Sequence, residues 1–136
     1  EIEWNNKDPF YDRDLENFKR LHAEGAISAG IIITRGISLQ ENLRELVRQF
    51  ALKRNLQSMD DIRALNLNPT PRQQRVYEQR VKAGMPFADA WSSAFVADKF
   101  GQATTHWRKL EDRINRGVGN PCPLLLIGLP ASIVEI

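Results

Sequence analysis

The chain lacks most of the features that would assign it at once to a specialised class of protein. Its 136 residues contain one cysteine, Cys122, so no disulfide can form within the chain, which is typical of a reducing compartment. No apolar run approaches the roughly 20 residues that a membrane-spanning helix needs, and no secretory signal pattern opens the chain. There is no internal repeat and no low-complexity segment. These absences predict a soluble, cytoplasmic protein with no membrane partner.

A large excess of charge of either sign is also missing. Nineteen Lys and Arg residues stand against 17 Asp and Glu residues, so the net charge is only +2. Overall charge therefore does not indicate a nucleic-acid-binding protein, and such a function would have to depend on the local distribution of charge. Hydrophobic residues make up 42% of the chain, which is ordinary for a globular protein, and the length fits one domain over residues 1–136.

The most informative stretch is the beginning of the chain. In an extended strand Glu1 and Glu3 lie on one face, with their carboxylates about 7 Å apart, near enough to serve one divalent ion and an attacking water. Asn5, Asn6 and Lys7 follow, and they supply amide groups and a cation suited to phosphate and base edges. Glu-x-Glu is a weak signal by itself, because solvent-facing residues of an edge strand often have this spacing.

A βαβ unit is predicted over the first 36 residues. The apolar spacing after Pro9 predicts a helix that ends at Gly25, and the β-branched run 29–36 predicts a strand buried on both faces. Parallel strands end at the same edge of a sheet, so we expect Arg35 to lie beside the polar cluster 5–7.

The rest of the chain is predicted to be mainly helical. Ser38 and Glu41 form a capping box that starts a helix, and residues 55–71 read as an irregular connection with a turn near Asp60. Three more helices and a last buried strand are predicted at 72–82, 86–100, 105–116 and 124–129.

Two further groups are candidates for binding phosphate. Thr104, Thr105 and His106 stand at the expected start of a helix, where backbone amides favour anions, although capping alone also explains Thr104. Arg13 lies one or two helical turns from the Glu-x-Glu strand. The aspartates on either side of it are explained by the electrostatics of a helix N-terminus.

The stretches 1–15, 30–36, 103–107 and 119–123 together resemble restriction endonucleases of the BamHI/BglII group, within the PD-(D/E)XK nuclease superfamily. The resemblance covers almost the whole chain, and the long opening motif is its most specific part. It implies an α/β fold with a mixed central sheet flanked by helices. It also implies a homodimer that grips palindromic double-stranded DNA and hydrolyses it with Mg2+, as type II restriction enzymes do.

The resemblance also gives roles to single residues. It implies that Glu1 binds the metal, helped by the backbone carbonyl of Ile2. Glu3 takes the position where most of the superfamily has lysine and the BamHI-like members also have glutamate. Asn6 matches an asparagine that approaches DNA, and Arg35 is expected to contact a base or a phosphate.

The family pattern includes another acidic metal ligand on an element before the Glu-x-Glu strand, and this chain has no such element. We therefore expect either that the N-terminal part of the fold is lacking or that another carboxylate, such as Asp8, substitutes. Alone, this chain is expected to bind magnesium poorly and to cleave slowly or not at all. Two alternatives stay open: a non-catalytic DNA-binding module or inactive relative with the same fold, and a metal-dependent hydrolase of small phosphates.

Overall fold

The computed structural model describes all 136 residues and divides into two compact units. Unit 1 comprises Glu1–Gln40 and Gln102–Ile133, and unit 2 comprises Glu41–Gly101 and Val134–Ile136. The chain has three strands and six α-helices, which agrees with the predicted α/β class. None of the helices is both long enough and apolar enough to cross a membrane. The assignment of the whole chain to one domain stays a prediction.

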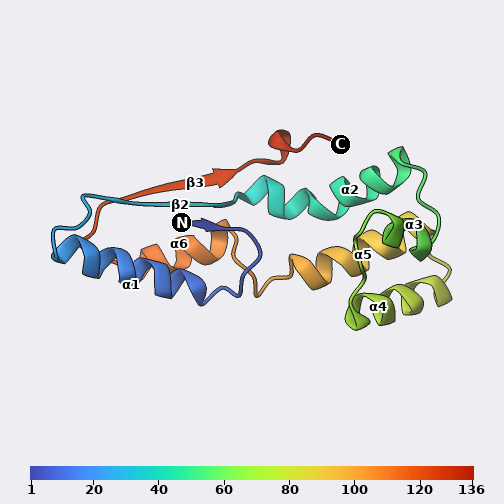
Figure 1. Cartoon of the computed structure of the whole chain (residues 1–136), viewed down its shortest axis with the longest axis horizontal. Coiled ribbons are helices and arrows are strands. Elements are labelled where there is room, and N and C mark those ends of the chain that lie inside the picture. Colours follow the sequence, from blue (N-terminus) through green and yellow to red (C-terminus); the bar gives the residue numbers. More distant parts are fainter. The chain divides into compact units, whose positions relative to one another are not determined.

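The elements follow the chain in an order that alternates strands and helices at its two ends (Figure 1). They are β1 (Ile2–Glu3), α1 (Phe10–Ala23), β2 (Gly30–Arg35), α2 (Ile37–Lys53), α3 (Met59–Ala64), α4 (Pro71–Lys82), α5 (Phe87–Lys99), α6 (Trp107–Asn115), β3 (Leu124–Leu129) and the short 3-10 helix η1 (Ala131–Ile133).

Unit 1 is built on a parallel sheet with the strand order β1-β2-β3. The predicted βαβ unit is confirmed, because β1 and β2 are parallel and α1 connects them. Glu3 pairs with Thr34, so the ends of both strands reach the same edge of the sheet. The resemblance implied a mixed sheet, but the three strands of this chain are all parallel.

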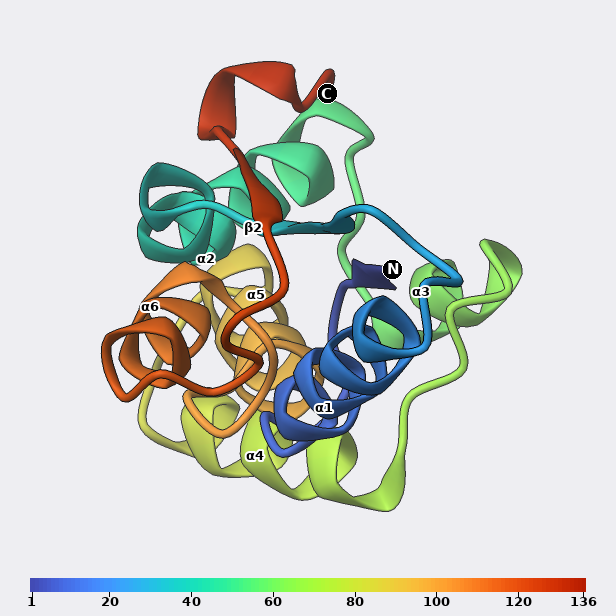
Figure 2. The same ribbon diagram turned by 90° about the vertical axis from the view of Figure 1, so that its left-hand side faces the viewer.

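One face of this sheet is covered by α1 and α6, which lie on the same side of it (Figures 1 and 2). Apolar side chains from both helices meet Ile32 of β2 in a core cluster, and all of them are fully buried: Tyr11, Leu15, Ile32 and Leu110. The sequence explains this packing, since the apolar residues of α1 recur at helical spacing.

The opposite face of the sheet is open. Ile31, Leu125 and Ile127 expose between 37% and 54% of their surface, and Ile2 exposes 69%. The prediction that the strands are buried on both faces is therefore wrong. Burial alternates along β2 and β3 although their sequences are apolar without interruption, because helices cover one face only. We call these four residues the open face.

Two predicted helix caps are also wrong. Helix α2 already begins at Ile37, so Ser38 lies inside it, and the Ser38 hydroxyl accepts a hydrogen bond from the N–H of Ala131 at 3.0 Å. In α6 the N-cap position belongs to His106. Thr104 instead forms an antiparallel bridge with Lys7, which ties the loop after β1 to the segment before α6.

Unit 2 contains α3, α4, α5 and most of α2. Its core cluster surrounds Trp91 and includes Met59 and Ile62 of α3. The prediction of an irregular connection over 55–71 missed α3. This short helix starts with a true capping box, in which Ser58 accepts from the N–H of Asp61 and the Asp61 side chain accepts from the N–H of Ser58.

Candidate active site

Glu3, at the carboxyl end of β1, is held by hydrogen bonds to both its backbone and its side chain. Its carbonyl oxygen accepts a hydrogen bond from Thr34 Oγ1 at 2.8 Å, and Thr34 Oγ1 lies 2.5 Å from the Tyr11 hydroxyl. Because Thr34 gives its only proton to the carbonyl, the Tyr11 hydroxyl is the donor to Thr34. Burial raises the pKa of Tyr11 to about 12, so the phenol keeps its proton. These two hydrogen bonds, from Tyr11 to Thr34 and from Thr34 to the Glu3 carbonyl, fix the backbone of Glu3.

The side chain of Glu3 is only 1% exposed and has three polar neighbours. Asn6 Nδ2 donates to Glu3 Oε2 at 2.7 Å, and Arg13 Nη2 donates to Glu3 Oε1 at 3.2 Å. The third neighbour is the carboxyl of Asp14, which shares the Arg13 Nη2 donor with Glu3. The structure therefore brings together three of the predicted site residues: Glu3, Asn6 and Arg13.

Asp14 is the residue that the sequence interpretation assigned to helix electrostatics alone. It is 1% exposed, and its Oδ1 accepts from Arg13 Nε at 2.9 Å and from Arg13 Nη2 at 2.7 Å. Its other oxygen, Oδ2, is buried without any hydrogen-bond donor. A carboxylate that serves only helix electrostatics stays in solvent. A signal was available, because Asp14 directly precedes buried Leu15 and lies three residues after buried Tyr11, on the inward face of α1.

Glu3 has an unusually high pKa for a carboxyl. Burial is the larger cause and the neighbouring Asp14 carboxyl adds to it, and together they raise the pKa of Glu3 to about 7. Asn6 and Arg13 act in the opposite sense, because they favour the charged carboxylate, but they do not offset the burial. Near neutral pH the Glu3 carboxyl is thus protonated for part of the time, and the Arg13 guanidinium lies against both carboxyls.

Glu1 and the carbonyl of Ile2 lie at the open edge of the sheet. The Glu1 carbonyl accepts from the N–H of Ile33 at 3.0 Å, so it faces β2. Because carbonyls alternate in direction along a strand, the Ile2 carbonyl faces away from β2, where no other strand follows. The Glu1 side chain is exposed. No group of three or more His, Cys, Asp or Glu side chains in the chain is arranged to hold a metal ion.

The loop after β1 is exposed and firmly attached. Asn5, Asn6 and Lys7 are all exposed to solvent. The Asn6 carbonyl accepts from the N–H of Thr105 at 2.8 Å, next to the bridge between Lys7 and Thr104. These bonds present the amide and ammonium groups of the loop on a fixed backbone.

Asp8, the alternative metal ligand, is engaged elsewhere. Its carboxylate lies 3.4 Å from Lys109 Nζ and 3.6 Å from Arg113 Nη2, both on α6. The carboxylate beside Glu3 is that of Asp14 instead.

The remaining predicted contacts are buried: Arg35, Thr104, Thr105 and His106. Arg35 Nη2 donates to Thr104 Oγ1 at 2.7 Å and to the Thr105 carbonyl at 2.5 Å, and Arg35 Nη1 donates to Gln40. Burial lowers the pKa of Arg35 to about 10 and also lowers that of His106. These residues fasten the segment that holds the loop after β1, and their contact with DNA stays a prediction.

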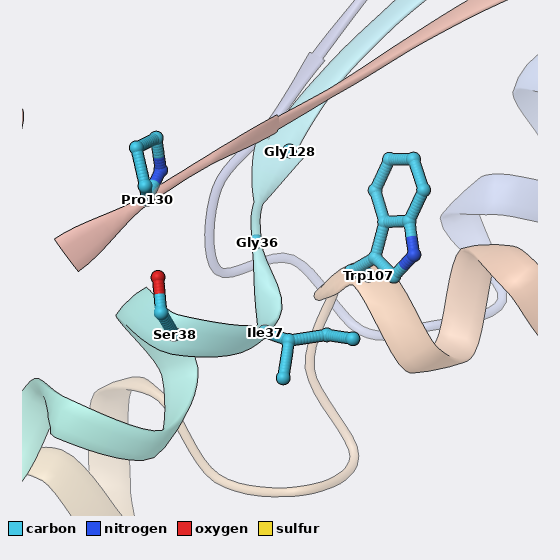
Figure 3. A pocket seen from close by; sticks show the side chains of 6 residues that line it. All are labelled: Gly36, Ile37, Ser38, Trp107, Gly128 and Pro130. Atoms are coloured by element: carbon cyan, nitrogen blue, oxygen red, sulfur yellow. The ribbon is translucent and has the colours of Figure 1, made fainter.

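A pocket of about 310 Å3 lies near the carboxyl ends of β2 and β3 (Figure 3). Trp107, Ile37 and Pro130 line it together with Ser38 and two glycines. A Cβ at Gly128 would stand 2.9 Å from the Trp107 ring, so glycine is required for the indole to approach the strand. The lining contains no charged or titratable side chain, and the pocket is therefore not part of the Glu3 site.

Comparison with known proteins gave one positive finding. The family model described as restriction endonuclease BglII/BglIII matches residues 1–129. No curated protein and no solved structure matched the chain. The matched range contains Glu3, Asp14 and every residue predicted from the sequence to belong to the site.

Proposed function

The chain belongs to the BglII/BglIII restriction endonuclease family, and on that premise we propose that it hydrolyses double-stranded DNA with Mg2+ bound beside Glu1 and Glu3. The family supports site-specific cleavage of DNA by a nuclease; the metal and the residue roles are our proposal. The observation that carries it is the buried Glu3 carboxylate, held by Asn6 and Arg13 at the carboxyl end of the edge strand.

The oxygen atoms at this edge have the chemistry that magnesium prefers. Mg2+ binds carboxylates and carbonyls and keeps several waters, so Glu1 and the Ile2 carbonyl provide a suitable partial set. Asp14 Oδ2 is a further carboxylate oxygen near this edge, and it accepts no hydrogen bond within the protein. A bound Mg2+ supplies a more acidic water and neutralises charge that develops on the phosphate.

Glu1 and the Ile2 carbonyl would hold the ion, and Glu3 would accept the proton of the attacking water. Arg13 and Asn6 favour the charged form of Glu3, which is the form that can accept a proton. Asn5 and Lys7 reach DNA from the exposed loop.

The buried residues Arg35, Thr104, Thr105 and His106 act by keeping this loop in place. In this proposal their effect on DNA binding is therefore indirect. The proposed fold is restriction-endonuclease-like, with this chain as its nuclease core.

The test is the digestion of plasmid DNA in Mg2+ by the protein and by two isosteric variants, Glu1→Gln and Glu3→Gln. We expect slow cleavage into discrete fragments by the wild type and a further loss of rate of roughly a hundredfold in each variant, since each removes a charge next to the reacting phosphate. Glu16→Gln, an exposed carboxylate on α1, is the matched control. Unchanged fragments from both variants would exclude the proposed roles. A wild type that binds the duplex without cutting it would support the non-catalytic DNA-binding module.

We also propose that the protein acts as a type II enzyme and as a homodimer on palindromic DNA. The family resemblance supports this, because two copies related by a twofold axis match the symmetry of a palindrome. Analytical ultracentrifugation with a duplex that is cleaved would show two protein chains per DNA, and a one-to-one complex would contradict the proposal.

A further inference from the structure

Helix α4 in unit 2 differs from the other helices in its charge. It carries four basic side chains, Arg72, Arg75, Arg80 and Lys82, and a single acidic one, Glu78. The whole chain has a net charge of only +2, so this helix holds a local excess of positive charge.

Several exposed arginines of other helices and their caps are paired with an acidic residue close in the chain. Arg20, Arg63 and Arg116 each contact an acidic residue three or four positions away, at 3.4, 2.8 and 2.7 Å. Such pairs are a common way for a helix surface to balance its charges. Their guanidinium groups therefore do not present unbalanced charge to a partner.

The basic side chains of α4 are not balanced in this way. Arg75, Arg80 and Lys82 make no ion pair and no hydrogen bond, and Arg72 only approaches Asp98 at 4.0 Å. Glu78 is four residues before Lys82, which is the spacing of a favourable pair.

Glu78 instead accepts a hydrogen bond from Gln74 Nε2 at 3.0 Å. The one acidic side chain of α4 therefore leaves the positive charge of the helix free for a partner outside the protein.

Three of these cations share one stripe of the helix. Arg72, Arg75, Gln79 and Lys82 are separated by three, four and three positions, which places them on one side. The stripe is about 15 Å long, and over that length one strand of B-DNA carries about four phosphates. The spacing of the cations thus suits a nucleic-acid backbone.

The opposite side of α4 is fixed to unit 2. Thr70 Oγ1 caps the helix by accepting from the N–H of Gln73 at 3.2 Å, and the buried Gln73 side chain donates to Asp98 at 2.8 Å. The Tyr77 ring packs edge-on against Phe87, with 5.7 Å between the centroids. The stripe is therefore displayed on a rigid support.

We propose that the stripe Arg72, Arg75, Gln79 and Lys82 binds the phosphate backbone of duplex DNA. This inference rests on the proposed function, because it adds a second contact surface for the same substrate. Phosphate contacts carry no sequence information, so α4 strengthens and orients binding while the choice of sequence lies elsewhere.

The test measures binding of a short fluorescein-labelled duplex by fluorescence anisotropy, in EDTA and over a range of KCl concentrations. Each phosphate contact contributes about 0.9 to the slope of log K against log salt. The double variant Arg75→Gln/Lys82→Gln should lower that slope by about 1.8 and weaken binding equally on two unrelated sequences. Circular dichroism confirms folding, since both side chains are exposed.

The matched control is Arg20→Gln/Arg63→Gln, which removes the same charge from two paired and exposed positions. An equal fall of the slope in both double variants would assign the effect to net charge and overturn the inference. The inference is also overturned if the Arg75→Gln/Lys82→Gln variant keeps the wild-type slope. It is overturned as well if the substitutions weaken binding of the protein to phosphatidylserine vesicles but not to the duplex. If cleavage is lost in Glu3→Gln while the α4 variant binds normally, the proposed function stands without this surface.

Discussion

The two faces of the sheet in unit 1 have similar sequences and opposite surroundings. Ile32 is fully buried under α1 and α6, whereas its neighbour Ile31 is 47% exposed on the open face. Glu3 points to the covered face, where burial raises its pKa, and Ile2 points to the open face. The comparison teaches that the apolar character of these strands does not determine their burial. The helices that cover the strands determine it, and they also create the environment of Glu3.

The largest difference between the faces is expected in stability. Ile32→Ala should lower the free energy of unfolding by about 3 kcal/mol, because it leaves a cavity in the core cluster. Urea denaturation followed by circular dichroism measures the change. A loss below 1 kcal/mol would mean that the covered face is not a packed core.

The next effect concerns Glu3 and pH in the absence of metal. Its folded-state pKa of about 7 is above the ordinary 4.5, so the folded protein keeps a proton that the unfolded chain has released. Stability should therefore fall as the pH rises from 4.5 to 7, by about 1.4 kcal/mol per unit at most from this group. Urea denaturation in EDTA measures this decline, and Glu3→Gln should remove it. A decline that persists in Glu3→Gln would assign it to other groups.

A smaller effect is expected from Asp14→Asn, which keeps the shape of the side chain and removes one of the two buried carboxylates. The variant should lower the pKa of Glu3 and flatten the fall of stability with pH, since Asp14 raises that pKa. At pH 7 the free energy of unfolding of the variant should be about 1 kcal/mol higher than that of the wild type. A weaker bond to half-exposed Arg13 offsets part of this gain. Asp12→Asn is the control, because Asp12 is on the same helix but pairs with Arg113 of α6 and not with Arg13 or Glu3.

The smallest effect belongs to the open face. Ile31→Thr keeps a β-branched side chain and should change the free energy of unfolding by about 0.5 kcal/mol or less, as at other exposed positions. The same urea titration applies. A loss as large as that of Ile32→Ala would show that the two faces are equally packed and would remove the contrast.

The sequence allowed the local part of the site to be predicted. Glu3 and Asn6 are three residues apart, and the rule that parallel strands end at one edge placed the end of the strand 29–36 beside them. Arg35 was expected at this edge as well, but its burial was not foreseen, because its partners Thr104 and Thr105 come from a distant segment.

Other features were hidden for physical reasons. The role of Asp14 depends on which side of α1 faces the sheet, and an aspartate near a helix start has a simpler explanation in the helix dipole. Helix α3 was missed because its cap uses Asp61, whereas the expected box has Glu or Gln at that position. The burial of only one face could not be read from an unbroken run of isoleucines.

The contact between Arg35 and Thr105 has a consequence for the timing of synthesis. These residues are 70 positions apart, and the whole of α2 to α5 lies between them in the chain. During translation the loop after β1 is made before Thr105, so its fastening has to wait until α2 to α5 have also been synthesised. A nascent chain that ends before Thr105 therefore carries Glu3 on a strand whose following loop is not yet fastened.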